Sequence, residues 1–232
     1  MDPGDAHPVI EFIEKNKLSL DSILITHYHN DHIGGVKSLK ERFACTVYSS
    51  AKDNHDFADK HLVEGDSVQL FDNDINFTII AVPGHTMGHI AYYCEKSAVL
   101  FCGDTLFSAG CGRMFEGTPE VFYQSLQKLA ELPLNTKVYC THEYTLSNLA
   151  FAQYIEPDNT DINNAIKKCH EDIAKGQTTL PSTISQELSI NPFLRCSTSS
   201  VQMKAKQINP QKNANPVEIF ATIRKLKDNF KA

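Results

Sequence analysis

The sequence predicts an α+β fold in which a β-rich part is followed by a smaller helical part. Short apolar segments with strand-like character recur until residue 140, each closed by turn-forming or polar residues. After residue 143 the apolar spacing is that of helices, and no alternating pattern remains. Hydrophobic residues make up 41% of the 232, which is ordinary for a chain with a substantial core. We therefore expect a β-rich domain over residues 1–142 and a helical domain over residues 143–232.

The most informative strands are four that each end at side chains able to bind a metal ion. They are expected at residues 22–26, 75–82, 98–102 and 137–140. The potential ligands that follow them are His27, His29, Asp31 and His32, then His85, Asp104 and His142. A sheet can assemble a site from distant segments when its strand ends lie together, so we expect these side chains to meet.

The remaining elements follow from periodicity and capping residues. Further strands are expected at residues 46–48, 67–71 and 90–94, with a turn at 72–74. Helices are expected at residues 8–17, 36–43, 118–132, 146–155, 160–175 and 216–230. Thr118 as N-cap and Pro119 at the first helical position mark one helix start. We further expect the end of a strand and a turn at residues 2–5, a polar surface segment at 54–61 and a polar connection at 197–215.

Residues 27–32, with the sequence H-Y-H-N-D-H, place three imidazoles and a carboxylate within six residues. These donors suit divalent ions such as zinc, iron and manganese. Three neighbouring surface histidines are the alternative, but donors at three further strand ends argue against coincidence. Seven donors exceed what one four-coordinate ion binds, whereas two ions about 3.5–4 Å apart that share a carboxylate would use them all. Asp104 suits the bridging position because a carboxylate has two oxygens.

A site of this kind predicts a hydrolase that needs no serine or cysteine nucleophile. Water between two dications is largely hydroxide at neutral pH, because even one zinc ion lowers the pKa of water to about 7. The same ions would polarise a carbonyl group and stabilise the oxyanion that forms from it.

The composition limits the partners. The net charge of −6 argues against nucleic acid and against an anionic membrane, so an anionic substrate would need a local basic patch. No segment has the length and apolarity of a membrane span, and the first residues lack the pattern of a signal peptide. The seven cysteines are odd in number and include no C-x-x-C pair, which favours free thiols in a reducing compartment. We therefore expect a cytoplasmic monomer with a small-molecule substrate.

Residues 26–32, T-H-Y-H-N-D-H, resemble the T-H-x-H-x-D-H signature of the metallo-β-lactamase superfamily. The chain further resembles the hydroxyacylglutathione hydrolase (glyoxalase II) family in four segments, residues 83–89, 101–107, 110–118 and 141–148. The resemblance extends over nearly the whole chain, from Asp2 to Phe230.

The resemblance implies an αββα metallo-β-lactamase sandwich with a C-terminal α-helical domain that binds glutathione. It implies hydrolysis of S-(2-hydroxyacyl)glutathione thioesters, chiefly S-D-lactoylglutathione to glutathione and D-lactate, in methylglyoxal detoxification. One ion would be bound by His27, His29, His85 and Asp104, and the other by Asp31, His32, His142 and Asp104. A bridging hydroxide held by Asp31 and Asp104 would attack the thioester. Zinc is the expected metal, with iron and manganese as alternatives.

Four substrate contacts are also implied by the resemblance: Arg113, Tyr144, Arg224 and Lys227. Without it, Arg224 and Lys227 would be interpreted as the solvated face of an exposed helix. Their charges suit the glycine carboxylate of glutathione and would supply the positive patch that the bulk composition lacks.

The chain departs from the family pattern in two places. Family members carry opening strands before the segment at residues 2–5, so we expect one sheet to have an incomplete edge with unpaired backbone groups. Phe115 occupies a position where some members have a tyrosine that contacts the substrate, so we expect that hydroxyl contact to be missing.

Other functions on the same scaffold remain as alternatives. A persulfide dioxygenase would use one iron, and a lactonase or general thioesterase would act on other esters, so metal stoichiometry would discriminate. A catalytically silent metal-binding protein is disfavoured by the complete set of seven donors and by the basic C-terminal helix. A nucleic-acid-processing enzyme would need a broad basic surface.

Overall fold

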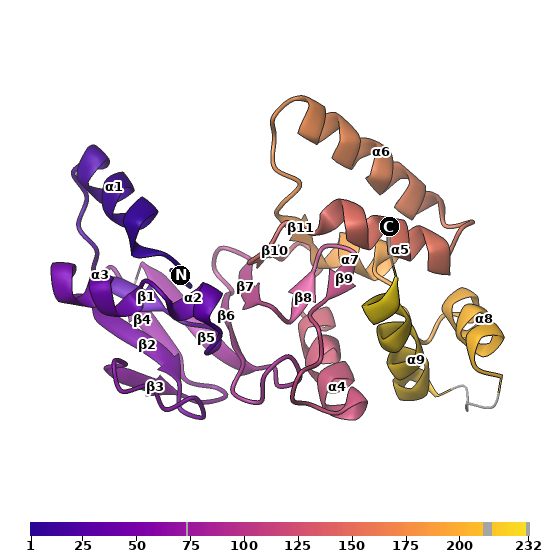
Figure 1. Cartoon of the computed structure of the whole chain (residues 1–232), viewed down its shortest axis with the longest axis horizontal. Coiled ribbons are helices and arrows are strands. Elements are labelled where there is room, and N and C mark those ends of the chain that lie inside the picture. The colour runs from indigo at the N-terminus through magenta and orange to yellow at the C-terminus, as the bar shows by residue number, and fades with distance from the viewer. Residues whose placement is uncertain (73, 211–214, 231–232) are drawn as a thin grey trace.

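A computed structural model of the chain describes residues 1–72, 74–210 and 215–230. Most strands lie in the first part of the chain, where β2 to β9 follow one another without a helix, and helices dominate after β10 (Figure 1). The helices of the described residues are α1 Ala6–Asn16, α2 Asn30–Ile33, α3 Val36–Phe43, α4 Pro119–Ala130, α5 Thr145–Ile155, α6 Thr160–Ala174, α7 Ile184–Ile190, α8 Ser199–Ile208 and α9 Pro216–Asn229. The strands are β1 Ser22–Leu24, β2 Thr46–Ser50, β3 Lys60–Leu62, β4 Ser67–Leu70, β5 Ile75–Ala81, β6 Ile90–Cys94, β7 Val99–Gly103, β8 Leu106–Phe107, β9 Gly110–Cys111, β10 Lys137–Cys140 and β11 Ser182–Thr183.

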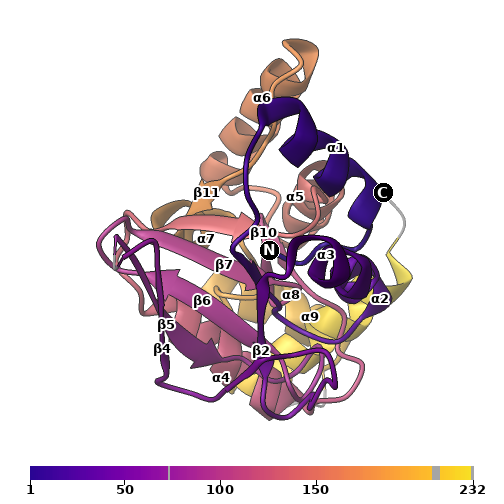
Figure 2. The ribbon, with the colours of Figure 1, turned by 90° about the vertical axis from the view of Figure 1, so that its left-hand side faces the viewer.

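The strands form two main sheets and one separate hairpin. The first sheet is parallel and has the order β1-β2-β3, with β1 at its edge. The second has the order β11-β10-β7-β6-β5-β4, and Figure 2 shows its strands side by side. Its only parallel pair among the described residues is β7 with β10, which places the ends of both strands at the same edge. The hairpin of β8 and β9 belongs to neither sheet.

The two sheets pack face to face with helices on both outer faces, which confirms the predicted αββα sandwich. The alternation along β6 shows the layering: Ile90 and Tyr92 point into the core between the sheets, whereas Ala91 and Tyr93 face the core beneath the later helices. A third core joins the parallel sheet to α1 and α3 through residues such as Val47 and Leu39.

The expected helices form, and one of them starts at the predicted capping residues. The Thr118 hydroxyl accepts a hydrogen bond from the Val121 amide at the start of α4, where Pro119 occupies the first turn. Asn215 caps α9 in the same way, with Pro216 after it. The expected strands at 46–48, 67–71, 75–82, 90–94, 98–102 and 137–140 also form, within one or two residues.

Two expectations for the second part of the chain were wrong. Residues 199–208 of the expected polar connection form α8, because Val201 and Ala205 are spaced i, i+4 and are buried in the core. Strand β11 also lies in this part, and it lengthens the larger sheet by pairing Ser182 with Val138. Residues 211–214 of that connection and residue 73 of the expected turn at 72–74 lie outside the described residues.

In the first part of the chain, one segment contains a strand that was not expected, and another lacks the strand end that was expected. The polar surface segment at 54–61 ends in strand β3, which begins at Lys60 and pairs with β2. Residues 2–5 contain no strand; the backbone N–H of Asp2 donates instead to the carbonyl of Leu24 at the end of β1. Among the described residues, no helix is both long and apolar enough to cross a membrane.

The helical part shares one continuous core with the larger sheet. Phe220 of α9 is fully buried, and its ring lies 5.9 Å from Phe122 of α4 and 5.9 Å from Phe193. The same cluster contains Leu100 of β7 and Val138 of β10. Packing of this kind couples the stability of α9 to that of the sandwich.

We predict that Phe220→Ala lowers the free energy of unfolding by about 3–5 kcal/mol, because it removes a fully buried ring and leaves a cavity. Urea unfolding followed by circular dichroism measures this loss. Phe12→Ala is the matched control, since Phe12 is 62% exposed and its removal should change stability by less than about 0.5 kcal/mol. A loss of similar size in both variants would contradict the shared core.

Candidate metal centre

The structure brings all seven predicted donors together at one edge of the sandwich. His27 and His29 lie in the loop after β1, and α2 follows with Asp31 and His32. The other donors follow β5, β7 and β10, and they are His85, Asp104 and His142. A register shift between Tyr139 and Cys140 interrupts the pairing of β10 with β7 just before the last of these donors. Such irregularities commonly re-aim side chains at sheet ends.

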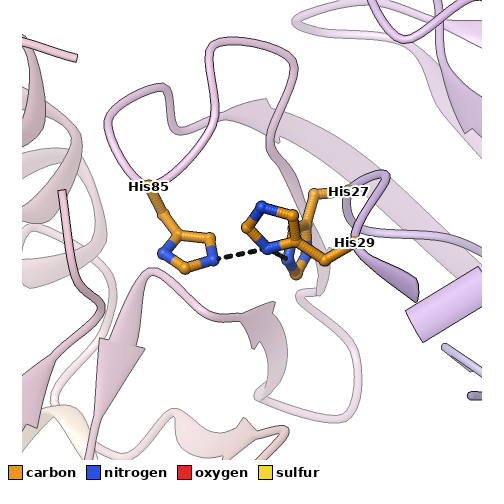
Figure 3. A group of neighbouring side chains, drawn as sticks. All are labelled: His27, His29 and His85. Carbon is orange, nitrogen blue, oxygen red and sulfur yellow. Dashed lines mark hydrogen bonds between the residues drawn. The ribbon is translucent and has the colours of Figure 1, made fainter. Parts of the chain in front are cut away.

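Three imidazoles form the first group of donors (Figure 3). Nδ1 of His29 lies 3.0 Å from Nε2 of His27 and 3.0 Å from Nε2 of His85. Nδ1 of His85 donates to the carbonyl of Arg113 at 2.7 Å, which leaves the Nε2 lone pair free to bind an ion. Burial lowers the pKa of His85 to about 4 and that of His27 much further, so both imidazoles are neutral and able to act as ligands.

The second group contains Asp31, His32 and His142. Oδ2 of Asp31 lies 3.4 Å from Nε2 of His142 and 3.7 Å from Nε2 of His32. Nδ1 of His32 faces Oδ2 of Asp2 at 3.3 Å, so Nε2 is again the nitrogen that points into the site. Burial lowers the pKa of His32, but the bond to Asp2 and the nearby carboxylates outweigh burial and raise it overall.

Asp104 lies between the two groups and faces both. Its Oδ1 is 3.5 Å from Nε2 of His32 and 3.5 Å from Nε2 of His142, and its Oδ2 is 3.6 Å from Nε2 of His85. The side chain is buried, and burial raises the pKa of its carboxyl group. One oxygen toward each group is the geometry that a bridging carboxylate requires.

Buried polar atoms of the site lack hydrogen-bond partners, and a bound cation would interact with them. Nε2 of His32 and Oδ1 of Asp104 are buried, and neither has a hydrogen-bond partner within the described part of the chain. Leaving such atoms unpaired is costly, because burial removes their water without replacing it. Imidazole and carboxylate donors match the preferences of zinc, iron and manganese. The residues present therefore fit a binuclear metal site.

The predicted substrate contacts lie around the same edge. Tyr144 stacks on His142 with ring centroids 5.3 Å apart, and it is 52% exposed. The side chain of Arg113 is also exposed, and its Nε lies 3.7 Å from Asp228 of α9. Lys227 donates to the carbonyl of Ser147 at 3.0 Å, in the first turn of α5. The end of α9 thus lies between the start of α5 and the glycine-rich loop formed by residues 110–117.

Arg224 differs from the others because its guanidinium is buried. It donates to the carbonyls of Cys111 and Gly112 at 3.0 and 3.3 Å and to Asp228 at 3.1 Å. Only 6% of the residue is exposed, so the solvated helix face that the sequence alone suggests is wrong here. Arg224 ties the glycine-rich loop to α9.

Two supporting residues were not found from the sequence. Asp2 accepts from the amide and the hydroxyl of Thr26, both at 2.8 Å, and thereby orients the carboxylate that faces His32. Glu116 accepts from the Tyr28 hydroxyl and from the Met87 amide, which joins three loops around the site. Neither has a local sequence signal, because each acts on residues more than twenty positions away. His89 is fully buried and supports the site as well, because it accepts from the amide of Asp104 at 3.0 Å.

The chain matches two family models that together span the described site. Residues 2–142 match the metallo-beta-lactamase superfamily, and residues 143–230 match the hydroxyacylglutathione hydrolase C-terminus. A hydroxyacylglutathione hydrolase of Pseudomonas fluorescens is 49% identical over 99% of this chain and 89% of its own length. The chain belongs to the hydroxyacylglutathione hydrolase family. Membership of this family also accounts for the helical part, which the superfamily match does not include.

Solved structures support the fold of this family member. ETHE1 from Myxococcus xanthus is similar, with a TM-score of 0.63 and 26% identity over 97% of this chain and 85% of that one. TTHA1623 in a di-iron-bound form has a TM-score of 0.60 and 26% identity over 83% of this chain and 87% of that one.

We predict that Asp104→Ala reduces the bound metal from two ions per chain to one or fewer, because both groups lose the carboxylate oxygen that faces them. Metal analysis of the purified variant after dialysis measures the stoichiometry. Asp56→Ala is the control, since Asp56 is exposed and lies 3.4 Å from Lys37, away from the donors. Retention of two tightly bound ions by Asp104→Ala would contradict the bridging geometry.

Proposed function

We propose that this protein hydrolyses S-(2-hydroxyacyl)glutathione thioesters, chiefly S-D-lactoylglutathione, to glutathione and D-lactate. The observation that carries the proposal is the position of Asp104, with one carboxylate oxygen toward each of two histidine groups. The name of the 49% identical Pseudomonas relative supplies the substrate class. The complete set of seven donors supports an active hydrolase and disfavours a silent metal-binding protein.

We assign His27, His29 and His85 to one ion and Asp31, His32 and His142 to the other, with Asp104 shared. When bound, two divalent ions would supply an acidified water molecule and polarise the thioester carbonyl. Asp31 and Asp104 would hold this water by accepting hydrogen bonds from it. The carbonyl of Arg113 and the carboxylate of Asp2 fix the orientation of His85 and His32 through their Nδ1 atoms.

We propose zinc as the metal, because imidazole and carboxylate ligands, including the neutral imidazoles of His27 and His85, suit it. Iron and manganese are the alternatives that the same donors accept. The similarity to TTHA1623 in a di-iron-bound form gives iron specific support.

We propose a division of roles between residues 1–142, which contain all seven donors, and residues 143–232, which contain most of the substrate contacts. Tyr144 and Lys227 flank the start of α5, and Arg113 approaches from the glycine-rich loop. The positive charges of Lys227 and Arg113 suit the carboxylates of glutathione. Arg224 adds its charge from beneath the loop, since its guanidinium is buried there.

We further propose that the protein is a cytoplasmic monomer that binds neither nucleic acid nor a membrane. All seven cysteines have free thiols, which fits a reducing compartment. The net charge of −6 favours neither nucleic acid nor an anionic membrane surface.

The function is tested by following loss of the thioester absorbance of S-D-lactoylglutathione while metal content is determined on the same sample. Rapid hydrolysis with close to two ions per chain is the expected result. Two ions without hydrolysis would indicate a different ester or thioester. One iron without hydrolysis would favour a dioxygenase.

We predict that Lys227→Ala raises KM about 10- to 100-fold with little change in kcat, because a charge-assisted hydrogen bond worth about 1.5–3 kcal/mol is lost from ground and transition states alike. Lys225→Ala is the control, since Lys225 is exposed on the same helix. A change confined to kcat would contradict a binding role for Lys227.

The substrate affinity should also depend on pH through Lys227. Burial, together with the nearby Arg224, lowers the pKa of Lys227 to about 8. The side-chain amino group is therefore charged below this pH and neutral above it. We expect kcat/KM to fall as the pH rises through about 8. Lys227→Arg remains charged over this range and should flatten the decline. An unchanged decline in this variant would show that another group causes it.

A further inference from the structure

The hairpin of β8 and β9 is an isolated ribbon that carries the chain from one part of the metal centre to another. It follows Asp104 by two residues and is followed by Gly112 and Arg113. Two-stranded ribbons are at best marginally stable on their own, and this one pairs with neither main sheet. Its conformation must therefore be fixed by other contacts.

Three buried side chains of the helical part supply these contacts. Glu187 of α7 accepts from the amide of Ala109 at 2.8 Å, and Asn148 of α5 donates to the carbonyl of Ser108 at 3.1 Å. Asn191, which ends α7, donates to the carbonyls of Phe107 and Gly110 at 3.2 and 2.8 Å and to Glu187 at 3.0 Å. The four residues of the turn thus each have a backbone group bonded to one of these side chains.

The fit between this network and the hairpin leaves little room for adjustment. Glu187 and Asn191 are fully buried, and Asn148 is 5% exposed. A Cβ atom on Gly110 would lie 2.5 Å from Nδ2 of the Asn148 side chain. Glycine at this position therefore permits the close approach of the Asn148 side chain to the hairpin. Ala109 adopts a left-handed conformation with φ 55°, and its amide is the one that Glu187 holds.

Any shift of the hairpin would move two parts of the metal centre. The amide of Gly112 donates to the carbonyl of Thr105 at 3.2 Å, which continues the ribbon to the residue next to Asp104. A Cβ atom on Gly112 would lie 1.9 Å from the carbonyl oxygen of Asp104, so the two segments are in close contact. The next carbonyl, that of Arg113, accepts the bond that orients His85.

We propose that Glu187, Asn191 and Asn148 are positioning residues that set the geometry of the metal centre through the β8–β9 hairpin. The inference rests on the proposed binuclear site and extends it, because it gives the helical part a role in metal binding as well as in substrate binding. Supporting contacts of this kind behind metal ligands commonly change metal affinity about 10- to 100-fold.

The test compares Glu187→Leu with Glu187→Gln and with Glu156→Leu. Leucine removes the acceptor for the Ala109 amide, whereas glutamine keeps an oxygen at that position. Glu156 is the matched control: it is a carboxylate of the helical part, 4% exposed, bonded to Arg195 at 2.8 and 3.0 Å. It forms no hydrogen bond to the hairpin within the described residues.

The primary measurements are metal affinity, by competition with a chelator, and amide hydrogen exchange of residues 104–113 in the metal-free protein. We expect Glu187→Leu to weaken the binding of at least one ion about 10- to 100-fold and to speed exchange in this segment. Glu187→Gln should restore both. Glu156→Leu should lower thermal stability but leave the affinity and the exchange of this segment unchanged.

Asn148→Ala provides a second, milder variant if Glu187→Leu does not fold, because it removes a single donor to Ser108. It should change affinity and exchange in the same direction. Equal metal affinity and exchange in the folded variants and the unmodified protein would overturn this inference alone. An unmodified protein that binds fewer than two ions would overturn the proposed function as well.

Discussion

The buried carboxylate of Asp104 places the strongest physical demand on this structure. Removing an ionised carboxylate from water costs several kcal/mol unless opposite charge lies close by. His27 and His85 do not supply this charge, because burial lowers their pKa values and leaves them neutral. Nε2 of His32 and Oδ1 of Asp104 have no hydrogen-bond partner among the described residues. A pair of divalent cations would satisfy all of these atoms at once, so the arrangement is best understood as a site built around metal ions.

The sandwich satisfies this demand by bringing the ends of distant strands to one edge. Because β7 and β10 are parallel neighbours, Asp104 and His142 follow them at the same end of the larger sheet. The loop after β1 reaches this edge from the other sheet, and a backbone bond from Ile90 to the Thr26 carbonyl holds it there. Supporting bonds then select which imidazole nitrogen faces the site, as the Arg113 carbonyl does for His85. The sheets bring the potential metal ligands to one edge, and these hydrogen bonds orient their side chains.

The sequence was informative where the signal is local and less so where it depends on long-range packing. The seven donors were identified because each follows an apolar segment and four of them lie within six residues. Helix α4 was predictable from Thr118 and Pro119, whose effects act within one turn. Helix α8 was missed because its polar composition hides Val201 and Ala205, which are buried only through contacts with distant elements.

The roles of individual residues are even harder to predict from the sequence than the elements are. Arg224 was placed at the substrate on the strength of a family resemblance, yet its guanidinium binds backbone carbonyls 112 and 113 positions away. Glu187 reaches Ala109 across 78 positions. Nothing in the local sequence around Glu187 indicates that its carboxylate is fully buried. Only the packed fold can identify these residues, because their partners are defined by tertiary contacts.

The helical part is therefore physically continuous with the metal centre. It pairs β11 with β10, inserts Phe220 into the core beneath the sheet, and bonds Arg224 to the glycine-rich loop. Burial raises the pKa of Glu187 to about 7, so keeping this group ionised inside the protein is unfavourable and an apolar residue would avoid the penalty. A carboxylate at this position is understandable if the acceptor it provides to Ala109 matters more than the stability it loses. The helical part would then hold the hairpin between Asp104 and Arg113 in addition to contributing the proposed substrate contacts.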